Sequence, residues 1–201
     1  MPCPTTRPLP NPVARSAAIA LATSVATVLA AGCSFVRPYS IDGAAEVAMV
    51  RVTTDFGGST FVNAIDLSPC PSGTSRTQLA ALTPLGLGLG GEVSPLKMVG
   101  TSPKKEELIR ERVVAAGKPL VLHVHGNRPA SIGVPGWQCG FGLTFLPQAG
   151  AQYEVAFKAN PNTCTGGVLR LGANEAGAVT RTPEPSARLI RLRDPDDLCR
   201  S

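Results

Sequence analysis

The chain has 201 residues, and 19 Lys and Arg against 14 Asp and Glu give it a modest formal charge of +5 at pH 7. This length suits one domain with a moderate core. Gly (21) and Pro (19) are frequent, while Phe, Trp and Tyr together make up 4% of the chain, so we expect many turns and short strands. The arginines are not interleaved with aromatic residues, and we therefore expect no nucleic-acid partner.

The first 32 residues have the pattern of an export signal. Arg7 and Arg15 are the only charged residues in this stretch, and residues 16–31 are an apolar run with a few hydroxyl side chains. A run of this length is typical of a signal peptide, whereas a membrane-spanning helix needs about 20 apolar residues. We therefore assign residues 1–32 to a cleaved leader and exclude them from the fold.

Residues 29–33, Leu-Ala-Ala-Gly-Cys, resemble the lipobox of bacterial lipoproteins. The resemblance implies cleavage after Gly32, acyl chains on Cys33 and a place in the cell envelope. Ser34 follows the cysteine instead of the Asp of an inner-membrane retention signal, so we expect an outer-membrane anchor with the protein facing the periplasm. Secretion after ordinary cleavage and retention as an uncleaved anchor are the alternatives.

The first half of the remaining chain predicts a tether followed by two strands. Residues 33–44 contain Pro38 and Gly43 and read as a lipidated tether. Alternating apolar residues predict strands over 47–54 and 60–67, and the turn residues between them predict a hairpin. Residues 68–93 are rich in Gly, Pro and Ser, and we expect a loop there.

The second half predicts more strands. Residues 102–117 are ambiguous, because a capping Ser, a Pro and a closing Gly favour helix while two adjacent valines favour strand; we predict a helical turn over 104–108 and a strand near 110–115. Further strands are expected over 120–124, 141–145, 153–159 and 168–171. This pattern is typical of a small antiparallel β-sandwich, immunoglobulin-like or similar, which we place over residues 45–175.

Residues 176–201 read as an Arg-rich C-terminal tail. Its arginines either meet lipid phosphates or an acidic partner, or they flank an exposed edge strand around Ile190 and Leu192. They are Arg181, Arg188, Arg191, Arg193 and Arg200.

Residues 139–155 combine a cysteine, an apolar strand, the motif Phe-x-Pro-x-Ala-Gly at 145–150, and Tyr-Glu-Val. This pattern is similar to one in small, uncharacterised bacterial lipoproteins, and residues 115–120 look like the strand entry that precedes it there. The resemblance covers roughly residues 51–171. Its motifs are structural, so it implies a fold and brings no activity with it.

Four cysteines remain once Cys3 is lost with the leader and Cys33 carries lipid. They are Cys70, Cys139, Cys164 and Cys199. An oxidising compartment favours disulfides, and four cysteines allow three pairings. We favour Cys139 with Cys164, because these two flank neighbouring predicted strands, and then Cys70 with Cys199. The sequence contains no Cys-x-x-Cys, the spacing that would indicate a zinc site, so we expect none.

His123 and His125 are the only histidines, and residues two apart in a strand share a face. Such a pair is able to ligate one metal ion, although a zinc site takes three or four protein ligands. A third ligand would have to be Asp66, Cys70 or Glu154. We favour the simpler interpretation, in which both histidines lie on the solvent face of a half-buried strand and the protein has no metal or cofactor.

The sequence therefore predicts a non-enzymatic, lipid-anchored envelope protein that acts as a periplasmic binding or structural module. Its expected contacts are the membrane, through the lipid, and an envelope protein, lipopolysaccharide or peptidoglycan. No Gly-x-Ser-x-Gly motif of a hydrolase occurs. The alternative is a metal-binding or redox-active lipoprotein that uses His123 and His125.

Overall fold

The computed structural model describes residues 37–41, 43–44, 46–67, 75–83, 96–100, 109–159 and 163–190. In these residues the secondary structure consists of strands alone. They are β1 (Val47–Thr54), β2 (Ser59–Asp66), β3 (Ser75–Leu82), β4 (Ile109–Ala115), β5 (Leu120–Arg128), β6 (Trp137–Phe145), β7 (Gln152–Ala159), β8 (Cys164–Ala173), β9 (Val179–Pro183) and β10 (Arg188–Ile190). Within the same ranges, no helix has the length and apolar character needed to span a membrane.

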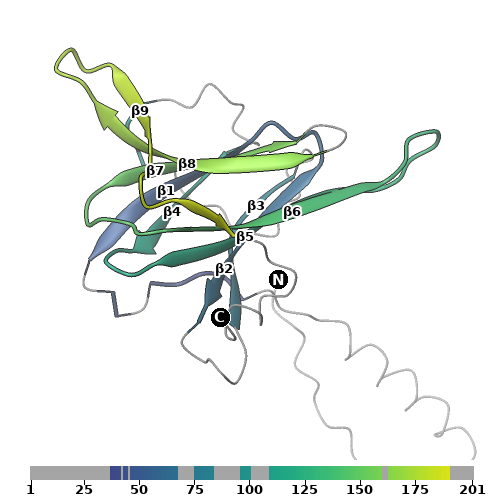
Figure 1. Ribbon diagram of the computed structural model, residues 1–201, viewed down its shortest axis with the longest axis horizontal. Helices are drawn as coiled ribbons and strands as arrows, with labels where there is room; N and C mark the ends of the chain where they lie inside the picture. Colours follow the sequence, from purple (N-terminus) through teal and green to yellow (C-terminus); the bar gives the residue numbers. More distant parts are fainter. Residues whose placement is uncertain are drawn as a thin grey trace, which may run out of the picture. The chain divides into compact units, whose positions relative to one another are not determined.

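The strands form two five-stranded sheets that pack as a β-sandwich (Figure 1), as the sequence predicted. The first sheet has the order β4-β1-β7-β8-β9, and the second has the order β10-β6-β5-β2-β3. Strand pairs are antiparallel except for β1 and β7, which run parallel. The first sheet is therefore mixed. We call the faces that meet the inner faces, and those turned away the outer faces.

The core lies between the inner faces and follows from the alternation of side chains along each strand. In β1, Ala48, Val50 and Val52 point inward and are almost completely buried. Tyr153, Phe145 and Phe157 are the largest of the fully buried side chains. Few aromatic residues thus supply much of the core volume, and short aliphatic side chains fill the rest.

Gly126 in β5 makes room for part of this aromatic packing. A Cβ atom on Gly126 would lie 2.8 Å from Cζ of Phe157 and 3.1 Å from Cδ1 of Phe56. Phe56 in turn contacts Phe157 edge-on, with ring centroids 5.9 Å apart, and Trp137 at 5.0 Å. The absence of a side chain at residue 126 is therefore a packing requirement of the core.

The prediction that residues 47–54 and 60–67 form a hairpin is wrong. β1 pairs with β4 and β7, whereas β2 pairs with β3 and β5 in the other sheet. The connection at residues 55–58 instead carries the chain across the sandwich. There the hydroxyl groups of Thr54 and Thr60 lie 3.0 Å apart in a buried hydrogen bond, and the Thr54 hydroxyl also accepts the N–H of Phe56.

β3 lies inside residues 68–93, where we expected a loop, so that expectation is wrong for residues 75–82. Its pairing with β2 shifts register between Val62 and Asn63, so its apolar residues do not alternate regularly. Leu79, Ala80, Ala81 and Leu82 are consecutive and all buried. The predicted strand near 110–115 is confirmed as β4, while the predicted helical turn at 104–108 lies outside the described residues.

The sandwich extends beyond residue 175, where we expected the C-terminal tail to begin. β9 joins the edge of the first sheet beside β8, and β10 joins the edge of the second beside β6. The turn between them is fixed by hydrogen bonds, because the N–H of Glu184 donates to the carbonyl of Val168 and the N–H of Leu146 donates to the hydroxyl of Ser186. Residues 191–201 lie outside the described part.

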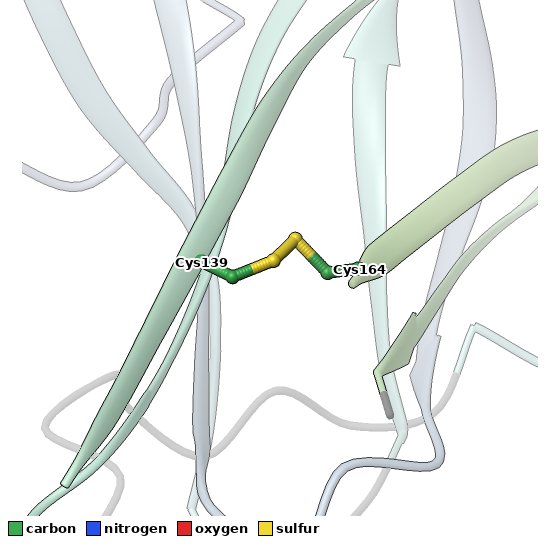
Figure 2. The surroundings of a disulfide bond; sticks show 2 residues. All are labelled: Cys139 and Cys164. Carbon is green, nitrogen blue, oxygen red and sulfur yellow. A yellow bond between two sulfur atoms is a disulfide. The ribbon is translucent and has the colours of Figure 1, made fainter. Parts of the chain in front are cut away.

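A disulfide between Cys139 and Cys164 joins the two sheets (Figure 2), which confirms the pairing predicted for these two residues. Cys139 is in β6 and Cys164 begins β8, and their Cα atoms are 6.1 Å apart. The bond closes a loop with a sequence separation of 25 residues. Cys70 and Cys199 lie outside the described residues, so their pairing stays a prediction.

Candidate functional site

The chain enters the sandwich at residues 37–39, shortly after Cys33, which itself lies outside the described residues. Gln78 of β3 donates its N–H to the carbonyl of Arg37, and Tyr39 donates its N–H to the carbonyl of Gln78. The Tyr39 hydroxyl accepts the N–H of Ala115 in β4 at 3.3 Å. One end of the expected tether is thus held against the edges of both sheets.

His123 and His125 lie on the outer face of the second sheet, as predicted. Their rings stack with centroids 5.3 Å apart, and Phe61 of β2 stacks on His125 at 5.1 Å. On the other side, β6 presents Gly140 and Gly142 in register with the two histidines. Both histidines are half-buried.

Burial lowers the pKa of both histidines below the ordinary value of 6.5. For His123 the neighbouring His125 and then Arg76 lower the pKa further, and for His125 Arg76 does so. All of these causes disfavour the protonated imidazole. Near neutral pH the pair is therefore uncharged.

The surroundings of the histidines do not resemble a metal site. Their Nδ1 atoms are buried without a hydrogen-bond partner, whereas metal-binding histidines usually donate the second ring N–H to an acceptor. Among the described residues, no cluster of three His, Cys, Asp or Glu side chains is suited to a metal ion.

The candidate third ligands do not complete the histidine pair. Glu154 belongs to the other sheet, where it pairs with Arg51 and Arg181. Asp66 follows Ile65, and alternation places it on the face of β2 opposite to the histidines. Cys70 lies outside the described residues.

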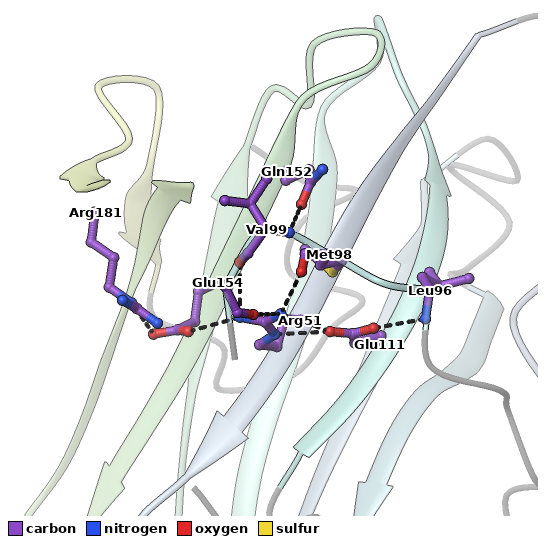
Figure 3. Close-up of polar contacts among 9 residues, drawn as sticks. Arg51, Leu96, Met98, Val99, Glu111, Gln152, Glu154 and Arg181 are labelled. Atoms are coloured by element: carbon purple, nitrogen blue, oxygen red, sulfur yellow. Dashed lines mark hydrogen bonds and ion pairs between the residues drawn. The ribbon is translucent and has the colours of Figure 1, made fainter. Parts of the chain in front are cut away.

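A second polar cluster, which was not among the sites predicted from the sequence, covers the outer face of the first sheet (Figure 3). Arg51 in β1 stands in register between Glu111 of β4 and Glu154 of β7. Its guanidinium lies 2.8 Å from the Glu111 carboxylate and 3.9 Å from that of Glu154, and Arg181 of β9 approaches Glu154 to 3.6 Å. The exposed fraction of the Arg51 side chain is 3%.

Residues 96–100, which we call the crossing segment, lie over this cluster. Arg51 donates to the carbonyl groups of Met98, Val99 and Gly100. The N–H of Leu96 donates to the Glu111 carboxylate at 2.7 Å. At the other edge of the sheet, Gly100 packs so closely on Val179 of β9 that a Cβ would overlap the valine side chain. Arg51 thus holds an otherwise irregular segment in place.

Only one signal in the sequence pointed to this cluster. Arg51 interrupts a strand in which Ala48, Met49, Val50 and Val52 are apolar, and alternation with Val50 and Val52 puts its side chain on the outer face. Its acidic partners come from β4 and β7, and Arg181 of β9, 130 residues away in sequence from Arg51, joins the cluster through Glu154. No local pattern indicates such partners.

The β5–β6 hairpin extends beyond its neighbours (Figure 1), and we call residues 128–137 the arm. The pairing of β5 with β6 continues to Arg128 and Trp137, whereas β2 stops accompanying β5 at Asn127. At the tip, Ser131 and Val134 exchange two backbone hydrogen bonds, and Gly133 has a φ of 73° that permits the tight turn. Ile132 is fully exposed at this turn.

Comparison with known proteins produced no relatives: no family model, no curated protein and no solved structure matches this chain. A functional assignment must therefore come from the geometry of the chain itself.

Proposed function

We propose that this chain is a non-enzymatic, lipid-anchored envelope protein, held at the outer membrane through Cys33 and facing the periplasm as a binding or structural module. Two features support the proposal: the lipobox-like sequence at residues 29–33, and the fixed entry of the chain into the sandwich at Arg37. The first feature carries it, because a cysteine at the end of such a leader is the residue that would receive the lipid.

The anchor and the module would be joined by a very short linker. The four residues from Cys33 to Arg37 span at most about 14 Å when extended. Arg37 is already hydrogen-bonded to Gln78 of the edge strand β3. A lipid on Cys33 would therefore hold this edge of the sandwich close to the bilayer, in contrast to a long linker that lets a domain move freely away from the surface.

A β-sandwich of this kind suits binding more readily than catalysis at the places described. The charged groups on one outer face are paired with each other, and the histidines on the other face are uncharged near neutral pH. The arm, by contrast, presents apolar side chains directly to the surroundings. We therefore assign the contact function to the arm.

The anchor is tested by Cys33→Ser in cells, with Cys3→Ser as the matched control. Serine cannot form the thioether that carries the lipid, so we expect the Cys33→Ser protein to lack acyl chains and to leave the membrane fraction. Cys3→Ser should behave like the parent, since Cys3 precedes the lipobox-like sequence. Acyl chains are detected by mass spectrometry of the N-terminal peptide. Membrane retention of Cys33→Ser at the level of the parent would overturn the proposal.

A further inference from the structure

The tip of the arm is an exposed apolar surface without acidic residues. Ile132 is fully exposed and Val134 is 43% exposed, and Pro129 and Pro135 flank them in the segments that join the turn to β5 and β6. The sequence contains no Asp or Glu from residue 112 to residue 153. An isolated exposed side chain needs no explanation, but apolar residues gathered on a projecting turn indicate a contact surface.

The base of the arm carries the residue types that favour the level of lipid headgroups. Arg128 and Trp137 are paired in register there. Together with Asn127 and Gln138 they line a shallow hollow of about 320 Å³. The Trp137 ring packs on Phe56 of the core, whereas Arg128 is exposed, and an arginine with an apolar stem favours a membrane–water interface. The arm is therefore apolar at its tip and polar at its base.

The size of the tip favours a lipid surface over a protein partner. A specific protein interface uses about 20–30 residues on each side. The exposed stretch of the arm is only residues 128–136. The turn at the end of the arm, residues 131–134, also has none of the tyrosine, tryptophan or arginine side chains that dominate binding to proteins. A fluid bilayer, in contrast, accepts a small apolar tip without needing a complementary shape.

We propose that the arm inserts Ile132 and Val134 into the bilayer to which the chain is anchored, a second membrane contact that rests on the proposed lipidation of Cys33. Residues 37–39 run parallel to β3 and enter from the end of the sheet where β3 begins, while the arm projects from the opposite end. His123 is level with Gln78, and Ile132 is nine residues farther along the hairpin, or about 30 Å. Two such contacts would hold the sandwich lengthwise along the membrane.

The arm contact with the bilayer is small, and it becomes effective chiefly because the lipid on Cys33 already holds the chain at the membrane. Two exposed aliphatic side chains give only weak binding to a bilayer on their own. A chain already tethered to the membrane presents its arm at a high effective concentration, so the second step becomes intramolecular. The arm would therefore set the orientation of the module, while the lipid sets its location.

The test uses tryptophan fluorescence, because Trp137 is the only tryptophan of the chain. The full lipidated protein is reconstituted into vesicles of phosphatidylglycerol and dibrominated phosphatidylcholine, whose bromine atoms quench nearby tryptophan. In a Trp137→Phe background, Ile132→Trp places the probe at the tip. The matched control is Leu189→Trp in the same background, because Leu189 is 61% exposed on β10, away from the arm.

We expect the emission of Ile132→Trp to shift to shorter wavelength and to lose intensity in brominated vesicles, while Leu189→Trp stays unquenched. Adding Val134→Asp should abolish the quenching at the tip, since a charge resists burial in lipid. Flotation with the vesicles measures the anchor independently. Protein that floats but shows no quenching at position 132, or equal quenching at both positions, would overturn the arm contact and leave the anchor intact. Crosslinking of position 132 to a second copy or another protein without quenching would also overturn it.

Discussion

The two outer faces of the sandwich handle titratable groups in opposite ways. On the first sheet, Arg51 is buried as a cation and is neutralised by Glu111 and Glu154 in adjacent strands. On the second sheet, His123 and His125 are half-buried without ionic partners, and their surroundings favour the uncharged rings. One fold thus buries titratable groups in two ways, either by pairing opposite charges or by lowering the pKa so that the group is uncharged. The two arrangements should respond differently to mutation and to pH.

The largest effect should come from removing the paired cation. Arg51→Met leaves Glu111 and Glu154 without their common partner and releases the carbonyl groups of the crossing segment. We expect the free energy of unfolding in urea to fall by about 3–5 kcal/mol, as is usual when one member of a buried ion pair is removed.

Arg181→Met is the control for this effect, because its side chain is 31% exposed and pairs only at the edge of the cluster. Exposed ion pairs contribute about 0–1 kcal/mol, so this loss should be small. Replacing Arg51, Glu111 and Glu154 together by apolar residues should restore much of the stability lost in Arg51→Met. Equal losses for Arg51→Met and Arg181→Met would show that the cluster does not stabilise this face.

A somewhat smaller effect should follow from removing the link between the two sheets. Cys139→Ser combined with Cys164→Ser frees the loop that the disulfide closes, and we expect a loss of about 3 kcal/mol in the free energy of unfolding. Since the bond joins β6 to β8, hydrogen exchange should quicken in both sheets. Exchange that quickens in only one sheet would show that the two faces are energetically independent.

The histidine face should be the pH-sensitive one. The folded state lowers the pKa of His123 and His125 below 6.5, so the unfolded chain binds protons first as the pH falls. Stability should therefore be full above pH 6.5 and should decline as the pH falls below that value. Urea unfolding measured from pH 8 to pH 5 tests this. His123→Gln with His125→Gln should remove this contribution, and an unchanged pH dependence in that variant would assign it to other groups.

The smallest effect is expected from truncating the same histidines at high pH. At pH 8, His123→Ala with His125→Ala should leave the protein folded, with a loss of about 1 kcal/mol or less, as for outward-facing residues. Element analysis of the purified protein should give the same metal content before and after the change. A bound metal that is lost together with a large drop in melting temperature would instead support the metal-binding alternative.

Several features of this fold were readable from local patterns. The alternation in residues 47–54 predicted which side chains of β1 face the core, and the His-x-His spacing placed both histidines on one face. The Cys139–Cys164 pair was predicted because the two cysteines flank strands that follow one another in the chain, and the bond itself joins the two sheets. The motif Phe-x-Pro-x-Ala-Gly at 145–150 ends in Gly150, which has a φ of 71° between β6 and β7.

Other features were decided by contacts between distant parts of the chain. The sequence does not indicate that β1 pairs with β7 in parallel instead of with β2, because alternation shows which residues share a face but not which strand lies alongside. β3 was not predicted because its pairing with β2 shifts register and because it contains two consecutive alanines, so its apolar residues do not alternate with polar ones.

By itself, then, the sequence determined the β class, the alternation of side chains in β1, the common face of His123 and His125, the Cys139–Cys164 pair and the lipobox-like leader, since each depends on residues close together in the chain. Only the tertiary structure decided the strand order, the partners of Arg51 and the projection of the arm. These depend on which strands meet in space. Packing of the whole core selects that arrangement, and no short stretch of sequence encodes it.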